Sequence, residues 1–183
     1  MHTSPIIDSR MTFEEAVAGT AAPENIIDCL CLLTVRYRAF DGLLHEGQLV
    51  VHKTAKNDII EIFRIIEKSE FPIARVIPIV RYNWSDDQSM AHNNTSAFNY
   101  RFVSGTERLS NHACGRAIDI NPYQNPVIYG NGHVSPPGAV FMPGAAGTFF
   151  EEHLLVREFL SRGWQWGGYF TSLKDYHHFD TPG

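Results

Sequence analysis

The chain contains, from Ser110 to Asp119, the segment Ser-Asn-His-Ala-Cys-Gly-Arg-Ala-Ile-Asp, with an imidazole and a carboxylate on either side of a glycine. Gly115 allows a sharp turn, so His112 in a loop and Asp119 on a strand can converge. A second segment, from Asp175 to Asp180, reads Asp-Tyr-His-His-Phe-Asp and adds further imidazoles and acids. Together the two segments offer two imidazoles and a carboxylate as ligands for a metal ion.

Such a ligand set suits catalytic zinc, which takes three protein ligands and keeps a fourth position for water. The metal lowers the pKa of that water and polarises a carbonyl, and a neighbouring carboxylate can accept the proton. The spacing alone also fits a solvated loop histidine and an aspartate that caps a strand end. Other chemistries lack their motifs, since the chain has no HExxH, G-x-S-x-G, P-loop or GxGxxG pattern.

The rest of the chain predicts an α+β fold, with a mainly antiparallel sheet and two or three packed helices. Residue patterns predict strands over 29–40, 48–52, 75–82, 97–103, 117–120, 164–170 and 177–180. They predict helices over 13–18, over 57–68 and from a capping box at Thr148 and Glu151 to Gly163. The polar residues 85–94 and the Pro- and Gly-rich residues 121–147 are predicted to be loops.

Length, charge and composition argue against several classes of protein. The 183 residues are one domain's worth of sequence, and residues 1–11 are expected to be a flexible end. A net charge of −5 argues against a nucleic-acid binder with a basic face, and no apolar run is long enough to span a membrane. The start shows no secretory signal. The three cysteines fit neither a disulfide framework nor a CxxC pair, and we expect them to be small core residues.

The two segments resemble the zinc peptidases of family M15. The first reads S-x-H-x-x-G-x-A-x-D and the second supplies D-x-x-H. The chain looks most similar to the VanY-like D-alanyl-D-alanine carboxypeptidases, a branch that also holds phage endolysins and L-alanyl-D-glutamate endopeptidases. Residues 93–101, 119–122 and 163–168 add to the resemblance, which covers about residues 30–181. It implies a single domain with the fold that this family shares with the Hedgehog signalling domain.

The resemblance implies that one Zn²⁺ per chain is bound by His112, Asp119 and His178. It implies that Asp175 is the general base, which takes a proton from the attacking water and returns it to the leaving amine. Arg101 falls where the family has an arginine that stabilises the oxyanion. Ser110 falls on the motif serine, which lies beside the site in position to contact substrate.

Two neighbours of these residues are open to more than one interpretation. His177 and His178 are adjacent, and a strand points them to opposite faces, so only one can be a ligand. The spacing from Asp175 favours His178, which leaves His177 as a surface or substrate-side residue. Asp180 is either a carboxylate that orients a ligand imidazole or a plain surface acid.

The resemblance implies hydrolysis of bacterial peptidoglycan stem peptides, with D-Ala-D-Ala carboxypeptidase activity favoured. The alternatives are an L-Ala-D-Glu endopeptidase and a zinc-containing module that binds wall peptides without cleaving them. A carboxypeptidase must neutralise the free carboxylate of its substrate; Arg81, Arg108 and Arg116 are candidates, and no feature of the sequence selects one. Such a substrate suggests the cell envelope or periplasm, or the cytoplasm for a recycling or phage lysis enzyme.

Overall fold

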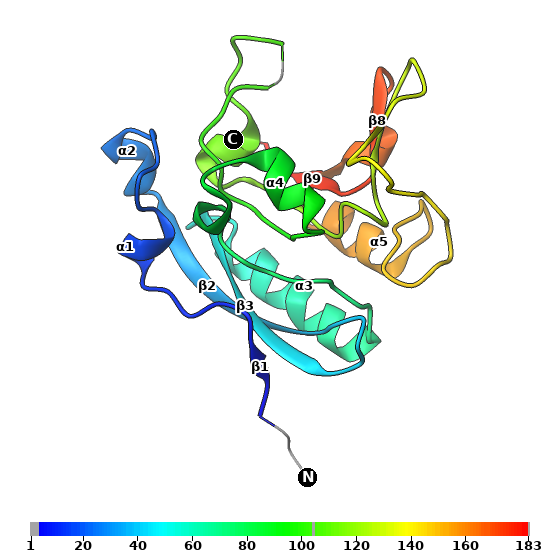
Figure 1. Ribbon diagram of the computed structural model, residues 1–183, viewed down its shortest axis with the longest axis horizontal. Helices are drawn as coiled ribbons and strands as arrows, with labels where there is room; N and C mark the ends of the chain where they lie inside the picture. The colour runs from blue at the N-terminus through cyan, green and yellow to red at the C-terminus, as the bar shows by residue number, and fades with distance from the viewer. Residues whose placement is uncertain (1–3, 104, 183) are drawn as a thin grey trace.

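A long antiparallel hairpin organises the first half of the chain, in a computed structural model that describes residues 4–103 and 105–182 (Figure 1). Its strands are β2 (Leu30–Arg38) and β3 (Leu44–His52), paired along their whole length from Leu30 opposite His52 to Arg38 opposite Leu44. Alternate residues of each strand face opposite sides of the hairpin. Both sides are covered, which explains why β3 is apolar from Leu49 to Val51 rather than alternating.

Helices lie on both faces of this hairpin. The amphipathic helix α3 (Lys56–Ser69) packs its apolar stripe on Leu33, Val35 and their neighbours in the main core. On the other face, the short helices α1 (Phe13–Ala16) and α2 (Glu24–Ile27) cover Leu30 and Val50 in a smaller core. Figure 1 shows α1 and α2 on one side of β2 and α3 on the other.

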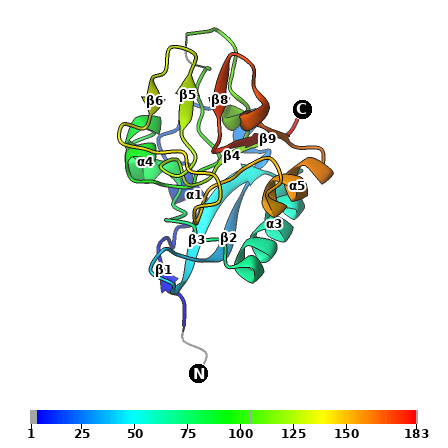
Figure 2. The same ribbon diagram turned by 90° about the vertical axis from the view of Figure 1, so that its right-hand side faces the viewer.

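Two small sheets form the second half, and they carry the site. One has the order β4-β9-β7, from β4 (Ala117–Asp119), β9 (His178–Asp180) and β7 (Gln165–Trp166). The other has the order β6-β5-β8, from β6 (Val134–Ser135), β5 (Val127–Tyr129) and β8 (Leu173–Asp175). Figure 2 shows this second sheet rising away from the β2–β3 hairpin. Helix α5 (Leu154–Ser161) packs against α3 and joins this half to the first.

Short helical segments connect these parts. They are η1 (Ile79–Tyr82), α4 (Asp86–Ala91), η2 (Asn111–Cys114) and η3 (Gly167–Tyr169). The main core runs through both halves, because Ile118 on β4 and Phe179 on β9 are fully buried with the residues of α3. Trp164 and Trp166 also belong to this core.

The start of the chain differs from the flexible end that we expected over residues 1–11. Ile6 and Ile7 form strand β1 (Ile6–Ile7), which pairs in parallel with β3. Next to them, Asp8 accepts hydrogen bonds from Tyr37 and from His45 Nδ1, the latter at 2.9 Å. These polar contacts attach the segment to the hairpin. Residues 1–3, which the same expectation included, lie outside the described part of the chain.

Five predicted elements were wrong. The predicted strand over 164–170 is only the two-residue strand β7, followed by the helical turn η3. Residues 75–82 form a single bridge at Val76 followed by η1, since Pro78 interrupts a strand and starts the helical turn. The predicted loop over 85–94 contains α4, whose N-cap Ser85 accepts from the Gln88 amide. Residues 97–103 pair only at Phe102, in a bridge outside the named strands. The predicted loop 121–147 holds β5 and β6.

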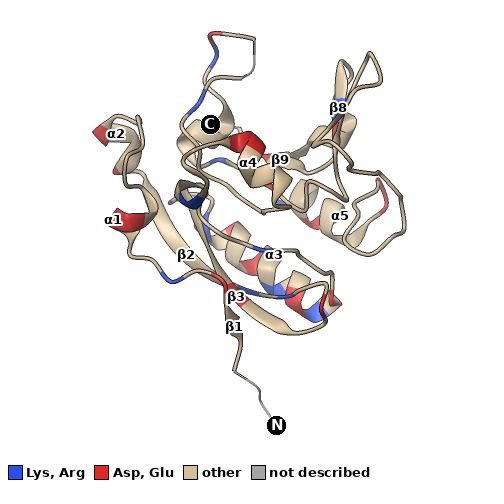
Figure 3. Ribbon diagram, viewed as in Figure 1, with Lys and Arg blue, Asp and Glu red and all other residues tan. Residues whose placement is uncertain are grey.

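The α+β class is confirmed, whereas the Hedgehog-type fold stays a prediction. The predicted start of the last helix was also wrong: His153, rather than Thr148, is the N-cap of α5, and it accepts a hydrogen bond from the Leu155 amide. In the described ranges, all three cysteines are free thiols, and the expectation that they are core residues was wrong, because Cys29 is exposed and Cys31 and Cys114 are only half-buried. Within the same ranges, every helix is too short or too polar to cross a bilayer. Asp, Glu, Lys and Arg residues lie along most of the ribbon, whereas residues 120–150 contain none (Figure 3).

Candidate metal centre and catalytic pocket

Strand register brings two of the predicted ligands together. Asp119 on β4 lies directly opposite His178 on β9, and the two strands are antiparallel. Residues opposite one another in such a pair have Cβ atoms about 5 Å apart. The fully buried Ile118 and Phe179 form the neighbouring pair and fix the register, because a slip of one residue would expose both.

A tight turn brings the third predicted ligand to the same place. His112 lies in η2, where the Ser110 side chain accepts a hydrogen bond from the His112 amide. Gly115 ends this turn in the left-handed conformation, at φ +66°. A Cβ on Gly115 would lie 2.6 Å from the His52 backbone nitrogen and 2.9 Å from the Val51 carbonyl carbon. The turn can therefore pack against β3 only with glycine at this position.

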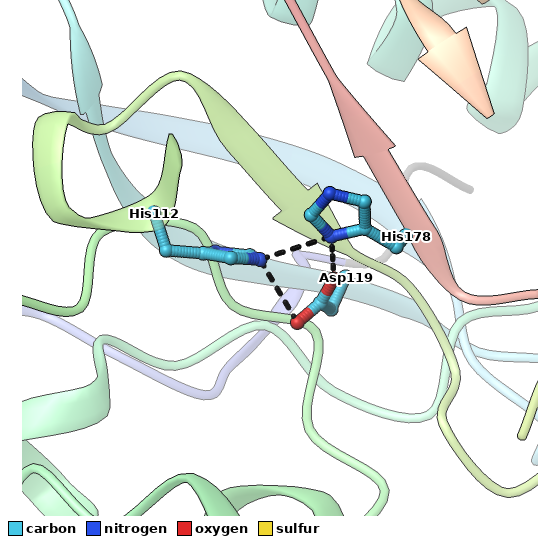
Figure 4. Close-up of side chains that lie close together, drawn as sticks. All are labelled: His112, Asp119 and His178. Atoms are coloured by element: carbon cyan, nitrogen blue, oxygen red, sulfur yellow. Dashed lines mark hydrogen bonds and ion pairs between the residues drawn. The ribbon is translucent and has the colours of Figure 1, made fainter. Parts of the chain in front are cut away.

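The three residues converge in a compact cluster (Figure 4). His112 Nε2 lies 3.2 Å from His178 Nδ1 and 3.2 Å from Asp119 Oδ2, and His178 Nδ1 lies 3.0 Å from Asp119 Oδ1. His112 and Asp119 are buried, and His178 is half-buried. Among the described residues, this is the group of histidine, cysteine and acidic side chains whose geometry could hold a metal ion.

Hydrogen bonds behind the cluster orient both imidazoles. His112 Nδ1 lies 2.5 Å from the Ala97 carbonyl, so this nitrogen donates and Nε2 keeps its lone pair. His178 Nε2 faces Asp180 Oδ2 at 3.4 Å, and Asn111 Nδ2 donates to the same oxygen at 2.6 Å. A proton on His178 Nε2 leaves Nδ1 as the atom that can bind a metal. Of the two interpretations of Asp180, the structure favours the one in which it orients a ligand.

The electrostatics of the metal-free cluster follow from burial and from these contacts. Burial alone would raise the pKa of Asp119, but the imidazoles of His112 and His177 and the hydrogen bond from His178 hold it well below its usual range. Burial would lower the pKa of His178, but Asp119 and Asp180 raise it to about 10. A metal ion that binds at neutral pH must therefore displace a proton from His178.

Asp175 lies beside the cluster and next to a second buried imidazole. Its Oδ1 is 3.0 Å from His177 Nε2, a close ion-pair distance without the alignment of a hydrogen bond. His177 is only 3% exposed, and its Nδ1 lies 2.8 Å from the Asn125 carbonyl. His177 lines the same cavity as the predicted site residues, which agrees with the substrate-side alternative, whereas the prediction of a surface position was wrong. That prediction assumed a continuous strand, whereas β9 begins at His178 and the preceding residue turns inward against buried Asn125.

A cavity opens over these residues. Its lining includes every predicted site residue: Arg101, Ser110, His112, Asp119, Asp175 and His178. Arg101 Nη2 forms an ion pair with Asp86 Oδ2 at 2.9 Å, and both side chains are about one third exposed. The sequence predicts a polar loop around Asp86, so this contact with the site was missed. The signal for it was Ser85 followed by two acids, which is typical of the first turn of a helix.

Comparison with known proteins agrees with this geometry. Residues 104–181 match the family model described as D-alanyl-D-alanine carboxypeptidase, one of the M15 peptidases. The match supports membership of the chain in this peptidase family, and it spans all three converging residues and Asp175. The searches of curated proteins and of solved structures found no match.

Proposed function

We propose that this M15-type peptidase is a zinc-dependent D-Ala-D-Ala carboxypeptidase that acts on peptidoglycan stem peptides, with one Zn²⁺ per chain. The observation that carries the proposal is the convergence of His112, Asp119 and His178 in a cavity that also holds Asp175 and Arg101. The family match supports the peptidase class. Zinc and the D-Ala-D-Ala substrate are the proposed refinements.

The residues present fit a zinc ion. Two imidazole nitrogens and one carboxylate are a common donor set for catalytic zinc. Each imidazole is oriented from behind, His112 by the Ala97 carbonyl and His178 by Asp180, as ligand histidines usually are. A bound Zn²⁺ would polarise the scissile carbonyl and acidify the attacking water.

Asp175 acts as the general base in this scheme. It accepts one proton from the water whose oxygen attacks the scissile carbonyl carbon, and it then delivers that proton to the amine nitrogen as the C–N bond breaks. The products are a shortened peptide and free D-alanine. His177 lies 3.0 Å from the base and is fixed by Asn125, so it limits the positions that the Asp175 carboxylate can take.

Arg101 stabilises the charge that develops on the carbonyl oxygen. Its guanidinium lines the cavity, and its Nε is buried without a hydrogen-bond partner among the described residues. The side chain is about one third exposed, so the outer nitrogens of the guanidinium can donate to an oxygen in the cavity that becomes negative during attack. A donor placed in advance for such charge typically speeds turnover by about 100- to 1000-fold.

The proposal is tested by analysing the products formed from two peptides. We expect the protein to release one D-alanine from a stem pentapeptide that ends in D-Ala-D-Ala and to leave a stem tripeptide intact, as followed by mass spectrometry. Cleavage between L-Ala and D-Glu in either peptide would instead identify an endopeptidase and overturn the carboxypeptidase assignment.

A second experiment separates an enzyme from a binding module. Asp175→Ala should abolish hydrolysis while zinc content and pentapeptide binding are retained, because Asp175 is not among the proposed ligands. Zinc content is measured by elemental analysis and peptide binding by calorimetry. If the unmodified protein binds zinc and pentapeptide and cleaves neither peptide, the non-catalytic alternative replaces the proposal.

A further inference from the structure

A short hairpin forms one wall of the cavity. Phe102 pairs with Leu109 in an antiparallel bridge, the Val103 amide donates to the Arg108 carbonyl at 2.8 Å, and the Ser110 amide donates to the Arg101 carbonyl at 3.0 Å. Side chains alternate between the two faces of such a hairpin. The pairs on either side of the bridge therefore share one face, which is the face that lines the cavity, and Phe102 is 54% exposed on the other.

Two arginines are thus brought to the same wall at different depths. Arg101 is level with Ser110, which immediately precedes the turn that carries His112. Arg108 lies two residues before Ser110, or about 7 Å further out along the strand. They are the only Lys or Arg residues among the described residues that line the cavity. Basic segments of this hairpin and the acidic start of α4 are visible in Figure 3.

The two arginines differ in their partners. The charge of Arg101 is balanced by Asp86 at 2.9 Å, whereas Arg108 makes no ion pair with any residue that the structure describes. An arginine stays protonated at all physiological pH values, so Arg108 brings an uncompensated positive charge to the outer part of the cavity. A planar guanidinium binds a carboxylate through two parallel hydrogen bonds.

The other candidates for carboxylate binding lie elsewhere. Arg81 is exposed in η1 and is absent from the cavity lining. Arg116 follows the turn at Gly115, and its Nη1 lies 3.4 Å from the carbonyl of Pro182, also outside the lining. The fold therefore separates three arginines that the sequence left equivalent.

We propose that Arg108 binds the free C-terminal carboxylate of the substrate and so determines that the enzyme is a carboxypeptidase. The inference rests on the proposed function. In a substrate cut before its last residue, the terminal carboxylate lies only one residue, about 3.5 Å, beyond the scissile carbonyl. Arg101 serves the scissile carbonyl, and Arg108, further out on the same wall, meets the carboxylate.

The test compares a D-Ala-D-Ala pentapeptide as the free acid with the same peptide as the C-terminal amide. For Arg108→Ala, kcat/KM for the free acid should fall roughly 10- to 100-fold, because a hydrogen bond to a charged group is lost. The value of kcat/KM for the amide should stay unchanged. Arg101→Ala should slow both peptides by the same factor. Arg116→Ala is the matched control outside the cavity and should resemble the unmodified protein on both.

Binding to the inactive Asp175→Ala protein provides the second measurement and requires no turnover. There the acid should bind more tightly than the amide, and adding Arg108→Ala should remove the difference. The inference is overturned if Arg108→Ala keeps the preference for the acid in both measurements, or weakens acid and amide equally. An unmodified protein that cleaves no peptide would refute the proposed function instead, and the binding comparison would still decide the role of Arg108.

Discussion

Replacing Gly115 with alanine should destabilise the protein far more than the same change at a glycine with free space around it. Gly115 has φ +66°, where an alanine costs about 1–2 kcal/mol in backbone strain. Its new Cβ would also lie 2.6 Å from the His52 nitrogen and 2.7 Å from Leu30 Cδ2, and such overpacking typically costs about 1–3 kcal/mol more. Together these two effects should lower the free energy of unfolding by about 2–5 kcal/mol.

Gly42 is the matched control, because its φ is +80° and a Cβ added there would meet nothing within 4 Å. Gly42→Ala should cost only the backbone strain. For a chain of this size 1 kcal/mol lowers the Tm by about 2–4 °C, so thermal unfolding of chelator-treated protein resolves the two variants. Gly115→Ala should also weaken metal binding, since its turn carries His112. Equal Tm losses in the two variants would refute the packing argument.

Further predictions concern the cluster and the N-terminal contacts. Alanine at any of the three converging residues should abolish metal binding and activity together, as measured by elemental analysis and peptide hydrolysis, whereas Arg101→Ala should keep the metal and lose about 100- to 1000-fold in kcat. Because the pKa of His178 in the metal-free protein is about 10, zinc uptake at pH 7.5 should release about one proton. Calorimetry in buffers of different ionisation enthalpy would detect the released proton. A binding enthalpy that is the same in all buffers would contradict proton release. Burial would lower the pKa of His45, but Asp8 and Asp41 raise it above its usual value. The stability from this pairing should be complete below about pH 6.5 and lost as pH rises through the raised pKa. The Tm advantage over His45→Gln should therefore shrink with rising pH, and a constant difference would rule the pairing out.

Periodic apolar patterns predicted the elements that build the core. The alternation over 29–40 matches β2, and the stripe over 57–68 matches α3 within two residues at each end. The predictions failed where tertiary contacts outweigh local preference. Thr148 and Glu151 have the pattern of a capping box, yet the helix begins six residues after Thr148 because the chain first buries Phe149 in the core.

The residues of the site that belong to the motifs in the two segments could be predicted from the sequence. The spacing of His112, Asp119 and His178 led to the cluster that strand register then assembles. The partners beyond the motif were not predictable, because they depend on contacts between distant parts of the chain. Asp86 reaches Arg101 from a helix where the residue pattern predicts a loop, and His177 is buried by Asn125, 52 residues away.

Titration of zinc into chelator-treated protein, with release of D-alanine from a D-Ala-D-Ala pentapeptide as the readout, tests the central claim most directly. We predict that activity is absent without metal, rises linearly with added zinc and levels off at about one equivalent per chain. Release of D-alanine at full rate from metal-free protein, or no release at any zinc concentration despite saturated binding, would contradict the account.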